Sequence, residues 1–260
     1  MITRYPAVAG TFYPANPGQL HAVLHQYLHD AQTDAEVPKA IIVPHAGYVY
    51  SGPVAASAYA LLKKRHKQIT RVVIIGPSHR VAFKGLAVSR ADMFSTPLGD
   101  IPLDREAVDK ITKFPFVEYL EQAHTREHSL EVQLPFLQET LDDFKIVPIV
   151  AGDASPEQVG QVIEALWGGD ETLLVISSDL SHYHDYATAK MLDQLTSERI
   201  ENRRYELLAP ESACGNVPVS GLLKIAREKS LSVTNIDLRN SGDTAGDKSR
   251  VVGYGAYVVE

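Results

Sequence analysis

Three histidines in this chain stand where apolar runs of strand length end. His45 closes the run "KAIIVPH", His79 closes "RVVIIGPSH", and "TLLVISSDLSH" passes through Asp179 to His182. In an open α/β sheet, ligands bind in the crevice beyond the carboxyl ends of the strands, so these side chains are expected to meet at one edge. Any one of them alone would be interpreted as a hydrogen-bonded turn residue. Three in the same position after three strands favour a functional site.

Neutral imidazole is the chemistry that these residues offer. It is a common protein ligand for Fe, Zn and Cu, and histidines from adjacent strand ends can share one ion. A third ligand is then needed, and the turn "RNSGDTAGD" before the last apolar run offers Asp243 and Asp247. The alternative for this turn is a solvated loop whose aspartates bond to their own backbone.

The elements that must position these residues alternate along the chain. Near-continuous apolar runs at "KAIIVP", "RVVIIGP", "KIVPIVAG" and "TLLVISS" predict strands that are buried on both faces. Helical patterns separate them, among them "NPGQLHAVLHQYLHDA", "SGPVAASAYALLKK" and "SPEQVGQVIEALW". We therefore predict an α/β fold with a mixed or mostly parallel central sheet and helices on both faces. The stretch "SRADMFSTPLGDIPLD" predicts a hairpin-like excursion, and "LSVTNIDLRN" and "RVVGYGAYVVE" predict closing strands.

Length and composition predict one domain over residues 1–260. The chain is 45% hydrophobic and 22% charged, as in an ordinary globular protein. Its single cysteine, Cys214, cannot form an internal disulfide, which fits a reducing cytoplasm. The net charge of −7 and the scattered basic residues argue against nucleic acid as a partner. No segment approaches the roughly 18 apolar residues of a membrane span and the first residues lack a signal-peptide core, so we expect a cytoplasmic protein without membrane association.

A family resemblance rests on seven motifs that occur in order. They are "PAVAGTFYPANPGQL", "VPHAGYVYSGPVAASAYA", "IIGPSHR", "TREHSLEVQLPFLQ", "ISSDLSHYHDY", "ACGNVPVSGLL" and "SGDTAGDKSRVVGYGAYVV". Together they resemble the Memo family over nearly the whole chain. Members of that family are related in fold to the class III extradiol ring-cleaving dioxygenases, whose iron is held by two histidines and a carboxylate.

This resemblance implies roles for the residues at the predicted edge. His45 and His79 would be metal ligands, and His182 with nearby Asp179 would occupy the acid–base position of the dioxygenases. Animal members place a cysteine before the last strand, where this chain reads "SGDTAGD", so Asp243 is the expected third ligand. Such a 2-His-1-carboxylate set suits Fe(II), with Zn or Cu as alternatives.

A second polar cluster lies in "TREHSLEVQLPF". Glu127, His128 and Glu131 fall at helical spacings, and the resemblance implies that this helix start borders the pocket. An ordinary charged surface helix is the alternative. Cys214, in the motif "ACG", is expected either to line the pocket or to be a small buried core residue.

Three functions are compatible with these expectations. The first is a metal-dependent oxidoreductase of the dioxygenase type that acts on an unknown small molecule or peptide. The second is a metal-dependent hydrolase, in which Zn(II) lowers the pKa of bound water to about 7. The third is a non-catalytic protein that binds a peptide or partner in the same crevice. Prokaryotic Memo proteins are associated with an AMMECR-type domain protein and a radical-SAM protein, in the AmmeMemoRadiSam system, so the resemblance implies these as partners.

Overall fold

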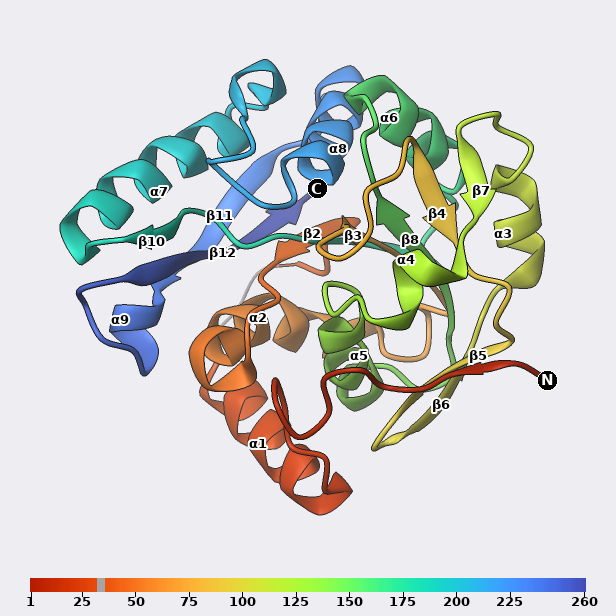
Figure 1. The fold of residues 1–260 in the computed structure, drawn as a ribbon, viewed down its shortest axis with the longest axis horizontal. Helices are drawn as coiled ribbons and strands as arrows, with labels where there is room; N and C mark the ends of the chain where they lie inside the picture. The colour runs from red at the N-terminus through yellow and green to blue at the C-terminus, as the bar shows by residue number, and fades with distance from the viewer. Residues whose placement is uncertain (32–35) are drawn as a thin grey trace.

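Four apolar runs form the centre of one sheet. In the computed structural model, which describes residues 1–31 and 36–260, these strands are β2 (Ala40–Val43), β3 (Arg71–Pro77), β8 (Lys145–Ala151) and β9 (Thr172–Ser177). Every residue of β2 and β9 is buried, as the unbroken apolar pattern predicts for strands that are covered on both faces. Figure 1 shows helices packed above and below these strands, which confirms the predicted single α/β domain.

The sheet is mixed, with a parallel centre and antiparallel edges. Its remaining strands are β4 (Leu86–Val88), β7 (Val117–Tyr119), β10 (His182–His184), β11 (Val233–Asn240) and β12 (Val251–Val259). The strand order is β10-β12-β2-β9-β3-β8-β4-β7, and β11 pairs with β12. β2, β9, β3 and β8 run parallel, so their carboxyl ends meet at one edge. The predicted closing strands are β11 and β12, which pair antiparallel.

The predicted hairpin forms a small second sheet. β5 (Met93–Thr96) and β6 (Gly99–Pro102) pair antiparallel, and β1 (Thr3–Arg4) adds to β5 in parallel. The N-terminal segment is therefore tied to the body of the domain from its third residue onward.

Helices form a layer on each face of the main sheet. They are α1 (Pro17–Asp30), α2 (Tyr48–Leu62), α3 (Arg105–Ile111), α4 (Glu121–Thr125), α5 (Leu134–Thr140), α6 (Pro156–Ala165), α7 (Tyr186–Glu201), α8 (Asn216–Glu228) and α9 (Ser241–Thr244). Short 3₁₀ turns lie at Lys63–Arg65, Glu131–Gln133 and Tyr205–Leu207. No helix in the described ranges is long and apolar enough to cross a membrane.

Alternate strand residues build two separate cores. Ile41 and Val43 of β2 pack in the core that α1, α2 and α5 cover, whereas Ala40 and Ile42 pack in the core of α3, α6 and α8. This alternation follows from the two-residue period of a strand, which sends successive side chains to opposite faces. Because both faces of the centre are filled, polar side chains can gather only beyond the strand ends.

Candidate metal centre

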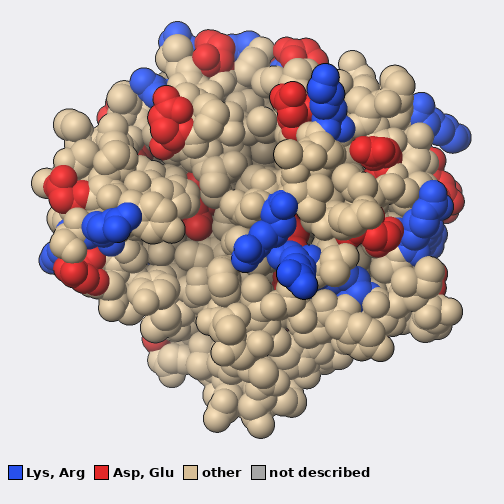
Figure 2. Space-filling view, in the orientation of Figure 1, with Lys and Arg blue, Asp and Glu red and all other residues tan. Residues whose placement is uncertain are grey.

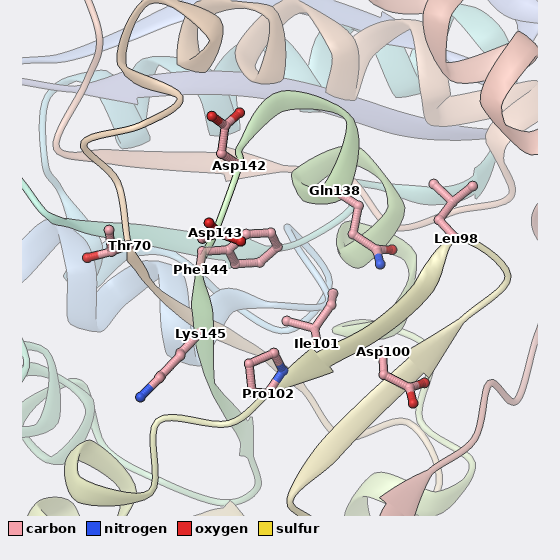
Figure 3. A pocket seen from close by; sticks show the side chains of 10 residues that line it. All are labelled: Thr70, Leu98, Asp100, Ile101, Pro102, Gln138, Asp142, Asp143, Phe144 and Lys145. Atoms are coloured by element: carbon pink, nitrogen blue, oxygen red, sulfur yellow. The ribbon is translucent and has the colours of Figure 1, made fainter.

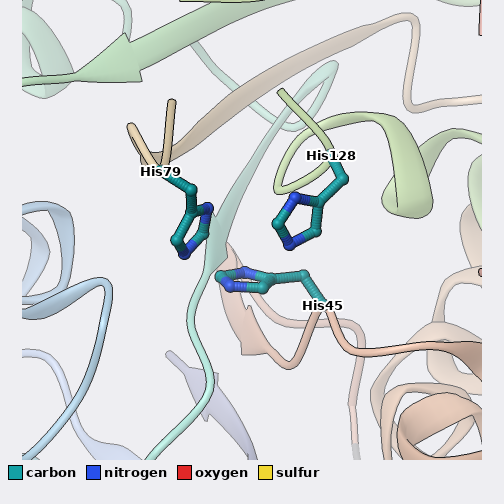
Figure 4. Close-up of side chains that lie close together, drawn as sticks. All are labelled: His45, His79 and His128. Atoms are coloured by element: carbon teal, nitrogen blue, oxygen red, sulfur yellow. The ribbon is translucent and has the colours of Figure 1, made fainter. Parts of the chain in front are cut away.

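Three histidines meet at the carboxyl edge of the parallel strands. One ring nitrogen from each of His45, His79 and His128 lies within 4.8 Å of the other two. The ring centroids are 5.1 Å apart for His45 and His79, 5.5 Å for His45 and His128, and 4.7 Å for His79 and His128. Figure 4 shows the three rings converging from separate segments of the chain.

Two of these histidines stand where the sequence predicted them. His45 comes two residues after β2 and His79 two residues after β3, so the sheet itself brings them together. The Nδ1 atom of His45 lies 2.8 Å from Oγ of Ser177, the last residue of β9, which pairs with Val43. The ring of His45 is therefore fixed by a neighbouring strand of the same sheet.

A buried carboxylate orients the other two rings. Oε1 of Glu127 lies 2.8 Å from Nδ1 of His79 and 3.5 Å from Nδ1 of His128. The backbone N–H of His79 donates to Oε2 at 2.6 Å, and those of His128 and Ser129 donate to Oε1 at 2.9 Å. Burial would raise the pKa of Glu127, but the hydrogen bonds and the charge of His79 outweigh it and lower this pKa to about 2.

The donor set fits a divalent transition-metal ion. Burial lowers the pKa of His45 well below its usual range, and it also lowers the pKa of His128, so both rings are neutral at physiological pH. Because Nδ1 of each ring faces Ser177 or Glu127, Nε2 is the ring nitrogen that could bind a metal, which is the arrangement found around metal-bound histidines. At His45 this nitrogen also lies 3.2 Å from Sγ of Cys214. Three imidazole ligands suit Zn, Cu, Fe or Ni.

Asp179 lies beside the histidines, inside the protein. Its Oδ1 accepts the backbone N–H of His45 at 2.8 Å, and its Oδ2 lies 4.0 Å from Nε2 of the same residue. Burial raises the pKa of Asp179, although that N–H and the nearby histidines act in the opposite direction. A carboxyl group with this environment can exchange a proton closer to neutral pH than an exposed aspartate can.

Cys214 also reaches the site. Its Sγ lies 3.2 Å from Nε2 of His45 and 3.3 Å from the backbone nitrogen of Asp179. Burial raises the pKa of this thiol to about 12, so it is protonated at neutral pH. Cys214 borders a cavity of about 240 Å³ that Phe83 and Asn216 also line. Cys214 was expected either to line the pocket or to be a small buried core residue. It is mostly buried and also lines a pocket, so both descriptions apply.

His182 lies close to the cluster without joining it. It begins β10, and its charge acts on the pKa of both His45 and Asp179. The strand is irregular here, because the pairing with β12 shifts register between His182 and His184 and Tyr183 has a φ of 63°. A non-glycine residue in that left-handed region is uncommon and is often found at functional sites.

The structure does not bring Asp243 to the histidines. Its Oδ2 accepts the backbone N–H of Asn240 at 2.9 Å, which completes a capping box at the start of α9, and its Oδ1 accepts the hydroxyl of Tyr186 at 2.6 Å. Asp247 accepts hydrogen bonds from Ser249 within the same turn. In the part of the chain that the structure describes, the third group of the cluster is His128, in place of the expected carboxylate.

The predicted helix through Glu127 and Glu131 is wrong. α4 ends at Thr125 and the next 3₁₀ turn begins at Glu131, so Glu127 and His128 lie in an irregular link between them. This link is what allows the Glu127 carboxylate to fold back onto neighbouring backbone N–H groups.

Glu131 holds the N-terminal segment in place beside the site. Its buried carboxylate pairs with Arg4 and accepts the backbone N–H groups of Ala7 and Val8 and the hydroxyl of Tyr13. It thereby holds the N-terminal segment against the site, where the ring of Phe12 packs on that of His128 with centroids 4.7 Å apart. The sequence carried no signal that Arg4 would pair with Glu131, because 126 residues separate them.

Another hollow, of about 460 Å³, lies at the opposite edge of the sheet, where β3 and β8 begin (Figure 3). It is lined by Thr70, Leu98, Asp100, Ile101, Pro102, Gln138, Asp142, Asp143, Phe144 and Lys145. No histidine or cysteine is among these residues, and within the described ranges the group of side chains able to hold a metal lies at the other edge.

Comparison with known proteins gives consistent matches over nearly the whole chain. The family model described as "Memo-like protein" matches residues 4–258. Among curated proteins, the chain is 38% identical to a MEMO1 family protein of Aquifex aeolicus over 98% of each chain, and 37% identical to one of Archaeoglobus fulgidus over 98% of each. It is also 39% identical to a MEMO1 family protein of Methanosarcina barkeri, over 99% of this chain and 100% of that protein.

Proposed function

Because the chain belongs to the Memo family, we propose that His45, His79 and His128 bind one divalent transition-metal ion and that this centre is the active site of a metal-dependent enzyme. One observation carries the proposal: three imidazoles converge, and each Nδ1 faces a buried partner. An ion held there would supply Lewis-acid or redox chemistry.

Asp179 is the proposed acid–base group of this centre. Its Oδ2 is 4.0 Å from Nε2 of His45, so a proton held on this carboxyl lies next to the ligand atom. Its raised pKa brings proton exchange by Asp179 closer to neutral pH than in an exposed aspartate, which suits general acid–base catalysis. We assign to His182 the exchange of that proton with solvent, because it is only partly buried and its charge acts on Asp179.

Iron-dependent oxidation of a small molecule is the reaction that we place first. The mixed α/β sheet with its ligands at the carboxyl edge is consistent with the fold of the class III extradiol dioxygenases. Zinc-dependent hydrolysis is the second candidate, and the all-imidazole donor set favours it. Three histidines with an open position form a common catalytic zinc site.

Elemental analysis of the protein purified without oxygen tests this proposal. We expect about one ion per chain, with iron supporting the oxidoreductase and zinc the hydrolase. A wild-type protein that carries no ion and takes up none on titration would contradict the proposal, and a non-catalytic binding protein would then be the better explanation.

A variant of Asp179 tests the catalytic role separately. Asp179→Asn keeps an oxygen for the backbone N–H of His45 but cannot titrate. We expect full metal content together with a rate on any identified substrate that is lower by roughly 10²–10⁴-fold. Wild-type rates in this variant would remove Asp179 from the mechanism.

A further inference from the structure

A further hollow is lined by the N-terminal segment and by residues that neighbour the proposed metal centre in the sequence. Its volume is about 710 Å³, and residues Ile2 to Val8 form one wall. Arg80 and Arg126 line it as well. Arg80 directly follows His79, and Arg126 directly precedes Glu127, the carboxylate that orients two of the rings.

These two arginines are exposed. Among the residues that the structure describes, no hydrogen bond, ion pair or ring contact involves either guanidinium group. The other charged residues of the hollow are already engaged. Arg4 is bonded to Glu131 and to two backbone carbonyls, and the carboxylate of Glu121 accepts from Ser89 and from a backbone N–H.

The hollow is therefore positive in a protein that is negative as a whole. The chain has a net charge of −7, yet Lys and Arg side chains gather near the middle of the face that Figure 2 shows. Arg80 is close enough to the centre that its charge is among the influences that lower the pKa of His128. Unpaired guanidinium groups beside a concave surface attract anions and can bind carboxylate or phosphate oxygens in pairs.

We propose that Arg80 and Arg126 bind the carboxylate or phosphate group of an anionic substrate in this hollow and present the rest of that molecule to the histidine cluster. This inference rests on the proposed function, since it names the chemical class of the substrate. Fixing the charged end of a substrate away from the reacting atoms is an effective way to orient those atoms.

Titration calorimetry on the full chain with inorganic phosphate and with benzoate tests the proposal. Part of each sample is first dialysed against a chelator, so that the anion cannot bind to a metal ion. We expect saturable binding that weakens as salt concentration rises. Arg80→Gln and Arg126→Gln should each weaken it by about tenfold or more, because charge-assisted hydrogen bonds are lost. Whichever anion binds more tightly identifies the substrate as a phosphate or a carboxylate.

The matched control is Arg204→Gln. Arg204 is also exposed, but it pairs with Glu206 on another part of the domain and should bind both anions like the wild type. Anion binding that is unchanged in both pocket variants, or absent from the wild type, would overturn the inference.

Metal content measured on the same samples separates this inference from the proposed function. Full metal content with no anion binding would overturn the anion site alone. Anion binding that requires both arginines, in a protein that never takes up metal, would support the anion site and contradict the metal centre.

Discussion

Glu127 offers a sharp test of how the metal centre is held together. Its carboxylate accepts three backbone N–H groups and faces Nδ1 of His79, so Glu127→Gln keeps the shape of the side chain but replaces one acceptor oxygen with an NH₂ group. An NH₂ group cannot accept a hydrogen bond, and in either orientation at least one N–H donor loses its partner. The ring of His79 then loses the charge that fixes its tautomer.

The expected loss of stability in Glu127→Gln can be calculated from the pKa of Glu127. This pKa is lowered from 4.5 to about 2, and a difference of one in pKa corresponds to about 1.4 kcal/mol, so the carboxylate contributes about 3 kcal/mol to stability at neutral pH. Because the pKa of this acid is lower in the folded state, that contribution is present above about pH 4.5 and is lost as the pH falls through about 2. Loss of a partner that orients a metal-bound histidine typically weakens metal binding by about 10–100-fold.

Two assays measure these effects on one preparation. Competition with a coloured chelator gives the metal affinity, and urea unfolding of the metal-free protein at pH 7 gives the stability. Glu139→Gln is the matched control, because Glu139 also faces a histidine, with Oε1 2.6 Å from Nδ1 of His21, but neither residue belongs to the cluster. If Glu127→Gln kept the wild-type affinity within about twofold and the wild-type stability, the carboxylate would not orient the ligands.

Three further variants test other parts of the structure. Burial lowers the pKa of His124 from 6.5 to about 4, so the unfolded chain binds its proton first and stability falls as the pH drops from 6.5 towards 4. His124→Gln should make urea unfolding less dependent on pH in that window. A Cβ at Gly253 would overlap the carboxylate of Asp193, so Gly253→Ala should lower the free energy of unfolding by about 1–3 kcal/mol. His182→Ala should keep the full metal content, because its ring lies outside the cluster.

Each of these three predictions has a result that would contradict it. An unchanged pH dependence in His124→Gln would mean that this ring is not buried in its neutral form. Gly160→Ala is the control for Gly253→Ala, since a Cβ there meets only ordinary contacts at 3.5–3.7 Å and a helical alanine is favourable. Equal stability of the two alanine variants would contradict the close packing at Gly253. Loss of metal in His182→Ala would make His182 a ligand.

The fold could be predicted from the sequence because its central strands are buried on both faces. Unbroken apolar runs such as "RVVIIGP" are typical of strands that are covered on both faces of a sheet. The polar residues that follow these runs must then lie at the carboxyl edge of the sheet. His45 and His79 follow from that rule alone. The position of neither residue depends on a contact between distant segments that cannot be predicted from the sequence.

The third member of the cluster was harder to foresee, for two physical reasons. His128 comes from a link between short helices, and it reaches the sheet edge only because Glu127 turns back onto the backbone. Asp243 looked like a ligand, but Asn240 and Asp243 stand at the spacing of a capping box, which satisfies the carboxylate locally. Recognising that pattern in "NSGD" would have removed Asp243 from the ligand set.

The metal content of two variants purified side by side tests the central claim most directly. In His128→Ala one of three imidazoles is missing, so elemental analysis should find most of the metal lost while the circular dichroism spectrum stays that of the wild type. Asp243→Ala should carry as much metal as the wild type, because this carboxylate only caps α9 and accepts from Tyr186. The opposite result, with metal retained in His128→Ala and lost in Asp243→Ala, would contradict the three-histidine centre.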